Sequence, residues 1–354
     1  MKGSPVKAAF LRYTDPMPLT LTAAADDDGR RLDRILRKSL PDTPLSLLHR
    51  LLRKGRILVD GKSGAADLRI RSGQTITVPL ERKTGEAESH SGETENTHNA
   101  RTSVGANPQS RFAVVNILFE SSDFLVLNKP AGLAVHGNDS LDTLAQAYLA
   151  PKIPPSLSFR PGPLHRLDKP TSGVIVFSAS LAGARRFSAL LRSRALTKGY
   201  LALAEGLIEK EGVWEDRLVR DHERRKTLSF INPHPLSACG NHYPSEHPPP
   251  PGEPPKTART RFKPLLVKPP YTLLQLEPDT GRTHQIRAQA AAHGHPLVSD
   301  RKYGSRQAGD LLLHAWFLET PDEPTAEPRL PRRIEAPPPE KFRARIKAIF
   351  GEEI

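Results

Sequence analysis

Two regions of the sequence predict a two-domain α+β protein. Before residue 80, two helical patterns are followed by short strand-like runs, which predicts a small α/β domain. Beyond residue 111, strand-like runs alternate with turns and amphipathic helical patterns, which predicts a larger domain built on a sheet. We expect a tail at 1–19, the small domain at 20–81, a linker at 82–111, the larger domain at 112–330 with an insertion at 233–255, and a C-terminal extension at 331–354.

The composition predicts a soluble cytoplasmic protein with a polyanionic partner. Fifty-two Lys and Arg against 39 Asp and Glu give a formal net charge of +13, which charge alone would match to RNA, DNA or an anionic membrane surface. A single cysteine excludes a disulfide framework and fits a reducing compartment. No apolar run approaches the roughly 20 residues of a membrane helix, and the N-terminus lacks the apolar region of a signal peptide. We therefore expect no membrane association.

The small domain has two basic helical patterns. Residues 30–40 place Leu and Ile near one helical face with Arg and Lys around the others, and residues 44–55 repeat the arrangement. Between Arg30 and Arg56 there are nine basic residues and two acidic ones, a pattern that fits a solvated face or a phosphate-binding face. Two short strands flank a turn at Asp60-Gly61, and a third strand-like run ends the domain near residue 80.

Two segments have compositions that oppose a packed structure. Residues 82–111 contain no aromatic residue, Leu or Ile and only one Val, so they cannot bury enough apolar area to offset their ordering entropy. Residues 233–255 contain nine prolines and indicate a surface insertion with polyproline-like conformations. Cys239, His242 and His247 lie in this insertion, but without a second Cys or regular spacing they predict no metal site.

The stretch most suggestive of chemistry is GPLHRLDKPTSG, residues 162–173, which precedes the strand-like run VIVFSA at 174–179. This order places Asp168 on a loop held by a buried strand, a position that suits a reactive group. By composition alone, an Asp between two basic residues is more often part of a solvated loop with local ion pairs.

These residues and four further strings closely resemble the signature motifs of the RNA pseudouridine synthases of the ribosomal large-subunit (Rlu) family. The strings are LNKPAGLAVHG at 127–137, KGYLAL at 198–203, GRTHQIR with GHPLVSDRKYG between 281 and 304, and RIEAPPP at 333–339. Residues 20–80 resemble the S-four-like (alpha-L) RNA-binding module. The resemblance implies an α+β catalytic domain with a mixed, mostly antiparallel sheet flanked by helices and loops. It also implies isomerase activity on RNA, with large-subunit ribosomal RNA favoured as the substrate. It implies no cofactor and no obligate protein partner.

The resemblance also assigns roles to residues. Asp168 is the expected catalytic carboxylate, acting either as a nucleophile on ribose C1′ or as a base on the C2′ proton. Tyr200 is expected to stack on the flipped base, and Arg282, in the first turn of a helix predicted to run from 281 to 294, to form an ion pair with Asp168; Arg287 is the reserve partner. The residues expected to contact RNA are Arg166, Lys198, Ile286, Arg287, Arg34, Arg37, Arg53 and Lys54.

His165 and the Lys129-Pro130 turn are expected to be structural. The main departure from the family pattern is Pro170, where an acidic residue is common, and a proline there stiffens the loop. Two other functions remain open at this stage. A non-catalytic RNA-binding ribosome-assembly factor could share the fold, and a metal-dependent nuclease would require a carboxylate cluster that is not evident near the HRLD string.

Overall fold

The computed structural model describes residues 18–79, 115–221, 226–231, 254–322 and 327–354, which form two compact units. The first unit contains residues 18–79 together with 154–159, and the second contains the remaining described residues from 115 onward. The predicted linker at 82–111 lies outside the described residues, as does the predicted insertion except for its last two residues, and so does the Cys239 cluster.

The first unit is a small four-stranded sheet with two helices. Its elements are β1 (Leu19–Thr22), η1 (Ala25–Asp27), α1 (Leu32–Ser39), α2 (Leu45–Arg53), β2 (Leu58–Val59), β3 (Lys62–Ser63) and β4 (Thr75–Val78). The strands are ordered β1-β4-β2-β3. Apolar residues of both helices and of β2 and β4 form its core, in which Ile35, Leu36 and Ile76 are fully buried. The predicted turn is present, with positive φ at Asp60 and Gly61.

Residues 154–159 belong to this first unit, although in the chain they follow helix α4 (Leu141–Leu149) of the second unit. The buried Asp27 carboxylate accepts hydrogen bonds from the Ser156 hydroxyl at 3.0 Å and from the backbone N–H groups of Leu157 and Ser158 at 3.0 and 2.9 Å. Burial acts to raise the pKa of Asp27, but these hydrogen bonds outweigh it and lower the pKa. The proposed boundary at residue 112 therefore requires one exception, because a hexapeptide beyond it packs with the small unit.

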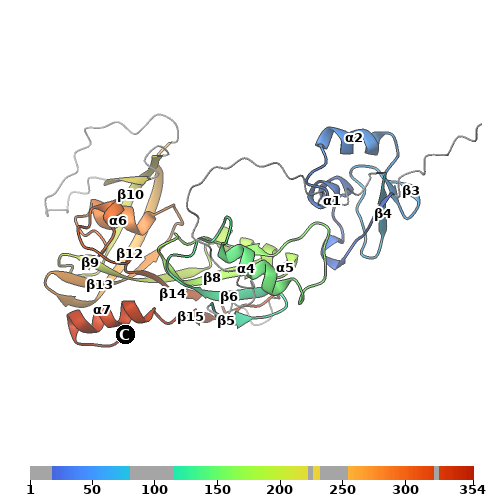
Figure 1. The fold of residues 1–354 in the computed structure, drawn as a ribbon. Helices are drawn as coiled ribbons and strands as arrows, with labels where there is room; N and C mark the ends of the chain where they lie inside the picture. Colours follow the sequence, from blue (N-terminus) through green and yellow to red (C-terminus); the bar gives the residue numbers. More distant parts are fainter. Residues whose placement is uncertain (1–17, 80–114, 222–225, 232–253, 323–326) are drawn as a thin grey trace, which may run out of the picture. The chain divides into compact units, whose positions relative to one another are not determined.

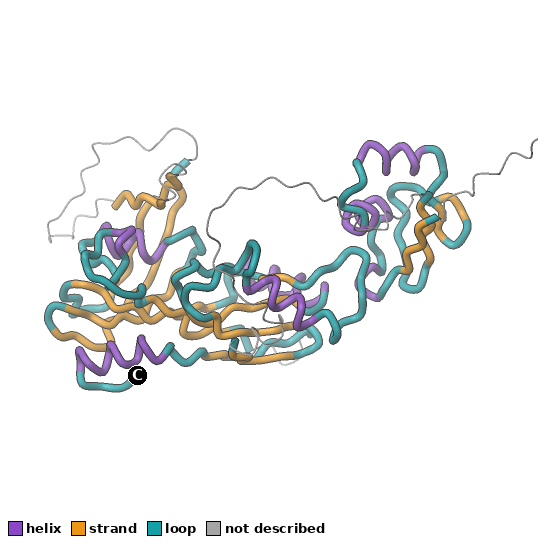
Figure 2. Tube along the Cα trace, in the orientation of Figure 1, coloured by secondary structure: helices purple, strands orange, loops and turns teal. Residues whose placement is uncertain are grey.

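The second unit is built on one mixed sheet (Figures 1 and 2). Its strands are β5 (Asn116–Glu120), β6 (Phe124–Lys129), β7 (Gly162–Pro163), β8 (Ser172–Ser178), β9 (Thr197–Glu205), β10 (Gly212–Asp221), β11 (Lys226–Ile231), β12 (Lys256–Lys268), β13 (Tyr271–Pro278), β14 (Leu313–Glu319) and β15 (Arg333–Glu335). The main order is β11-β10-β12-β13-β9-β14-β8-β6-β5, with β15 on β14 and β7 on β8. The β8/β14 pair is parallel and the other strand pairs are antiparallel, so the predicted mixed, mostly antiparallel sheet is confirmed.

Helices cover both faces of this sheet because its strands alternate apolar side chains. On β9, Ala202 and Ala204 face the cluster that contains α6 (Gln285–Ala292), whereas Leu201 and Leu203 face α7 (Glu340–Phe350). Figure 1 shows α6 and α7 on opposite sides of these strands. On β6, alternate residues face the cluster containing α4 (Leu141–Leu149) and the one containing Phe187 of α5 (Leu181–Arg192).

Three features differ from the sequence prediction. Helix α6 begins at Gln285 rather than near Gly281, so Arg282 lies in the preceding turn. The C-terminal residues are part of the second unit, because β15 pairs with β14 and α7 buries Phe342 and Ile346. Strands β10 and β14 and helix α4 were not predicted. Among the described residues, the helices are all too short or too polar to span a bilayer.

Candidate active site

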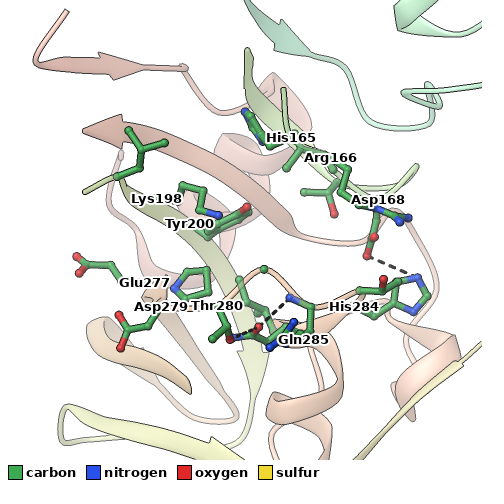
Figure 3. Close-up of a pocket in the computed structure, with 18 of the residues that line it drawn as sticks. His165, Arg166, Asp168, Lys198, Tyr200, Glu277, Asp279, Thr280, His284 and Gln285 are labelled. Carbon is green, nitrogen blue, oxygen red and sulfur yellow. Dashed lines mark hydrogen bonds and ion pairs between the residues drawn. The ribbon is translucent and has the colours of Figure 1, made fainter. Parts of the chain in front are cut away.

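One pocket of the second unit contains most of the residues singled out in the sequence (Figure 3). Its volume is about 630 Å³, within the range of small-molecule sites. Its lining comes mainly from three chain segments, the HRLD loop at 164–171, residues 191–200 leading into β9, and residues 277–287 before and at the start of α6, with Arg261 of β12 and Leu313 of β14. These segments meet because β8, β14, β9 and β13 are consecutive strands of the sheet.

Asp168 lies on the loop between β7 and β8, and the TSG sequence after it holds this loop. Gly173 has φ +113°, and a Cβ there would lie 2.0 Å from the carbonyl oxygen of Ala315 on β14. Only glycine permits this close parallel approach of β8 and β14. Asp168 itself closes a turn, since its carbonyl accepts a hydrogen bond from the Thr171 N–H at 3.1 Å. Pro170 lies inside this turn, where the closing bond does not use its missing N–H.

A buried histidine continues this support. His314 on β14 donates from Nε2 to the carbonyl of Ala336 at 2.9 Å, and its Nδ1 then accepts from the Ser172 hydroxyl, also at 2.9 Å. Burial lowers the pKa of His314 to about 4, so the ring is neutral. A neutral ring protonated at Nε2 satisfies both of these hydrogen bonds. His314 thereby connects the TSG string to the RIEAPPP string, and these two strings lie more than 150 residues apart in the chain.

Lys129 joins the loop at residues 130–133 to the HRLD loop by hydrogen bonds. Its side chain is fully buried, and Nζ donates to the carbonyls of Pro130, Leu133 and Lys169 at 2.9, 2.8 and 3.1 Å. Burial lowers the pKa of Lys129 to about 8, while the nearby Asp168 carboxylate opposes that shift. His165, in contrast, packs on Phe187 and accepts a hydrogen bond from the Val176 N–H. Both residues have the contacts expected of structural roles.

Arg287, not Arg282, forms the ion pair with Asp168. Nη1 of Arg287 lies 3.2 Å from Asp168 Oδ2, and the other side of the guanidinium is held by Asp300 through Nε and Nη2 at 2.7 and 2.8 Å. All three side chains are shielded, with exposed fractions of 15% for Asp168, 7% for Arg287 and 1% for Asp300. Burial opposes ionisation of Arg287, but the two carboxylates outweigh it and raise its pKa.

The prediction for Arg282 is wrong because the helix starts later than expected. Gln285 accepts from the Arg282 N–H and the Thr280 hydroxyl, and its amide donates to the carbonyl of Arg259 on β12. His284 then adopts a left-handed conformation with φ +55°. This turn leaves Arg282 exposed at the pocket rim, with Nε 3.5 Å from the carbonyl of Thr257.

His284 and Tyr303 complete the surroundings of Asp168. Tyr303 accepts a hydrogen bond from the Thr227 N–H at 2.9 Å, so its hydroxyl donates to His284 Nδ1 at 2.8 Å. Burial lowers the pKa of His284 to about 4, and Asp168 opposes this shift. The neutral imidazole therefore directs its Nε2–H toward Asp168 Oδ2, 3.7 Å away. Asp168 is thus paired with the Arg287 guanidinium and lies near the N–H group of His284, a contact that Figure 3 marks.

The other predicted pocket residues also meet here. Tyr200 on β9 packs against the same apolar cluster as Ile286 of α6, and both line the pocket. Burial, aided by the charge of Asp168, raises the pKa of Tyr200, so its hydroxyl is protonated. Lys198 is half-buried on the same strand, and Arg166 is exposed at the rim. Arg287, predicted both as the reserve partner of Asp168 and as an RNA contact, is held between its two carboxylate partners with an exposed fraction of 7%.

The basic residues predicted for the small domain are all exposed on the first unit. Arg34 and Arg37 lie on α1, Arg53 ends α2 and Lys54 follows it. These four side chains are not part of the core of the first unit, which is formed in part by the apolar faces of α1 and α2. The described residues contain no group of three His, Cys, Asp or Glu side chains arranged to hold a metal ion.

Sequence reasoning missed Asp300, His284 and Tyr303 as members of the site. All three lie in the strings GRTHQIR and GHPLVSDRKYG, which were recognised only as a motif. No periodicity marks Asp300 as the partner of Arg287, because the two are 13 positions apart and a helix, a turn and a loop separate them. The only signal was the presence of these side chains inside the motif.

The pocket thus contains a shielded carboxylate paired with an arginine, and comparisons with known proteins identify the family of the chain. The model of the RNA pseudouridylate synthase family matches residues 123–292. Ribosomal large subunit pseudouridine synthase C of Salmonella typhimurium is 31% identical over 347 residues, and that of Escherichia coli K12 is 30% identical over 347 residues; each match covers 92% of this chain and 95% of the relative.

The solved structure of human RNA pseudouridylate synthase domain containing 4 has a TM-score of 0.50 and 22% identity, covering 68% of this chain and 95% of that one. This likeness concerns the fold. The chain belongs to the RNA pseudouridine synthases, a family of isomerases. The resemblance inferred from the sequence motifs is therefore confirmed.

Proposed function

We propose that this chain converts specific uridines of large-subunit ribosomal RNA into pseudouridine, with Asp168 as the reacting carboxylate. The observation that supports this most strongly is the position of Asp168, which lies in a pocket of nucleoside size and is held by Arg287 at 3.2 Å. The relatives with matching length bear names that specify the ribosomal large subunit. The proposed substrate follows from their names, and the carboxylate follows from the pocket.

The reaction requires the N1–C1′ bond of the uridine to break, the base to turn, and C5 to bond to C1′. Asp168 either attacks C1′ or removes the C2′ proton, and in both routes the bonding electron pair leaves with N1 of the base. When C5 joins C1′, either the Asp168–C1′ bond breaks or the proton held by Asp168 returns to C2′. C5 then loses its proton and N1 gains one, so no external reactant is consumed. The target must first be flipped out of its stack, which costs a few kcal/mol. Tyr200 and Ile286 supply surfaces that hold the free base.

The decisive experiment compares tritium release from large-subunit ribosomal RNA transcribed with uridine labelled at C5. We expect release by the wild-type protein and none by Asp168→Asn, which keeps the size of the side chain but cannot act as a nucleophile or base. Asp310→Asn is the matched control, since Asp310 is exposed and pairs with Lys341 at 3.1 Å on the surface. Release by Asp168→Asn would refute the assigned carboxylate. RNA binding without release by the wild-type protein would favour the assembly-factor alternative.

The first unit is proposed to bind RNA phosphates through Arg34, Arg37, Arg53 and Lys54. These residues are exposed on helices α1 and α2 and together carry four positive charges. Phosphate contacts release counterions, so each lost contact should reduce the slope of log affinity against log salt by about 0.7–0.9. Replacing all four with Gln should therefore weaken RNA binding and flatten this slope. An unchanged slope would show that these side chains do not contact the phosphates.

A further inference from the structure

Lys198 is a cation of the pocket that has no paired acceptor among the residues that the structure describes. It lies on β9 two residues before Tyr200, so both side chains project from the same face of the strand toward the pocket. Its ammonium points toward the loop before α6, because a Cβ built on Gly281 would lie 3.8 Å from Nζ. Throughout the described ranges, no carboxylate or hydrogen-bond acceptor is paired with it.

The other shielded cations of the site differ in this respect. Lys129 donates to three carbonyls, and Arg287 is shared between two carboxylates. A half-buried ammonium has three donors and no acceptor, and leaving them unmatched is costly. Burial accordingly lowers the pKa of Lys198. Because Lys198 lines the open pocket, the complementary acceptor is expected to come from the ligand.

The pseudouridine reaction provides such an acceptor. When the N1–C1′ bond breaks, the electron pair stays with the base, and the uracil anion spreads its charge over N1, O2 and O4. Attack by Asp168 on C1′ and removal of the C2′ proton both produce this anion. We propose that Lys198 is a catalytic residue that binds a carbonyl oxygen of the departing uracil and stabilises its negative charge. This inference rests on the proposed function of the pocket.

The arrangement of the pocket supports this role. Figure 3 shows the Lys198 side chain beside the ring of Tyr200, with Asp168 farther along the pocket. A uracil stacked on Tyr200 with C1′ near Asp168 would direct a carbonyl edge toward the ammonium. The uracil is neutral before bond cleavage and anionic afterwards, so the interaction strengthens as the reaction proceeds. A preorganised donor of this kind accelerates the chemical step more than it improves RNA binding.

The test separates chemistry from binding by single-turnover tritium release at saturating enzyme. Lys198→Met keeps the length and apolar stem of the side chain but removes its charge, and we expect a loss of about 100-fold in the single-turnover rate. Its RNA affinity should change little. Lys198→Arg should keep part of the rate. The matched control is Lys210→Met, which removes an exposed cation that does not line the pocket and should leave the single-turnover rate unchanged.

A second measurement distinguishes a missing charge from a disturbed structure. Ethylammonium should raise the rate of Lys198→Ala, whereas ethanol at the same concentration should not. A wild-type single-turnover rate for Lys198→Met, or equal rescue by ethanol, would overturn the inference. Failure of the wild-type protein to release tritium would instead refute the proposed substrate, which is a separate result. Thermal unfolding of each variant checks that the fold is retained.

Discussion

Asp300→Asn tests whether the carboxylate behind Arg287 keeps the site in order. Asp300 accepts two hydrogen bonds from Arg287 at 2.7 and 2.8 Å, and its side chain is 1% exposed. Removing one partner of a buried ion pair costs about 3–5 kcal/mol. Asparagine keeps the shape and one acceptor oxygen, so we expect the free energy of unfolding to fall by about 2–3 kcal/mol.

Activity should fall as well, because Arg287 would lose the anchor that directs Nη1 to Asp168. A displacement of about 1 Å at a reacting group can cost about 100-fold in rate. Urea unfolding and single-turnover tritium release measure the two effects on the same protein sample. Asp310→Asn, at an exposed pair, should change stability by less than about 0.5 kcal/mol and leave the rate unchanged. Wild-type stability and rate for Asp300→Asn would refute this account of the site.

Two further predictions concern the support of the HRLD loop. Gly173→Ala should lower the free energy of unfolding by about 3 kcal/mol or more in urea titrations, because the added Cβ would overlap the Ala315 backbone and φ at this position is positive. The control is Gly162→Ala, because the space around Gly162 is open. Equal effects of the two substitutions would contradict the explanation. The pKa of His314, about 4 when folded and about 6.5 when unfolded, predicts stability that is present above pH 6.5 and is lost as the pH falls toward 4. The free energy of unfolding should therefore be larger at pH 7 than at pH 5, and His314→Gln should reduce this difference by about 2 kcal/mol. If the difference is unchanged in the variant, His314 is not its source.

Local patterns were enough to predict much of the fold. The β-branched run predicted as a strand at 174–179 lies almost entirely in the fully buried strand β8. On β9 the side chains alternate between two clusters, with Ala202 and Ala204 in one and Leu201 and Leu203 in the other. Such predictions succeed because the period of side-chain direction follows from backbone geometry within a few residues. Strand β14 was missed, although it lies at the centre of the sheet, because its buried run includes His314 and Trp316 and lacks clear alternation.

The sequence by itself determined the family, the reacting carboxylate that we propose and part of the pocket, because these depend on residue types at short spacings. Only the tertiary structure decided which arginine pairs with Asp168. The start of α6 depends on bonds from Gln285 to the backbone of β12, 26 residues away in the chain, and that start directs Arg287 inward and Arg282 outward. The tertiary structure also showed that no acceptor among the described residues is paired with Lys198, since contacts between distant segments decide which charges are paired.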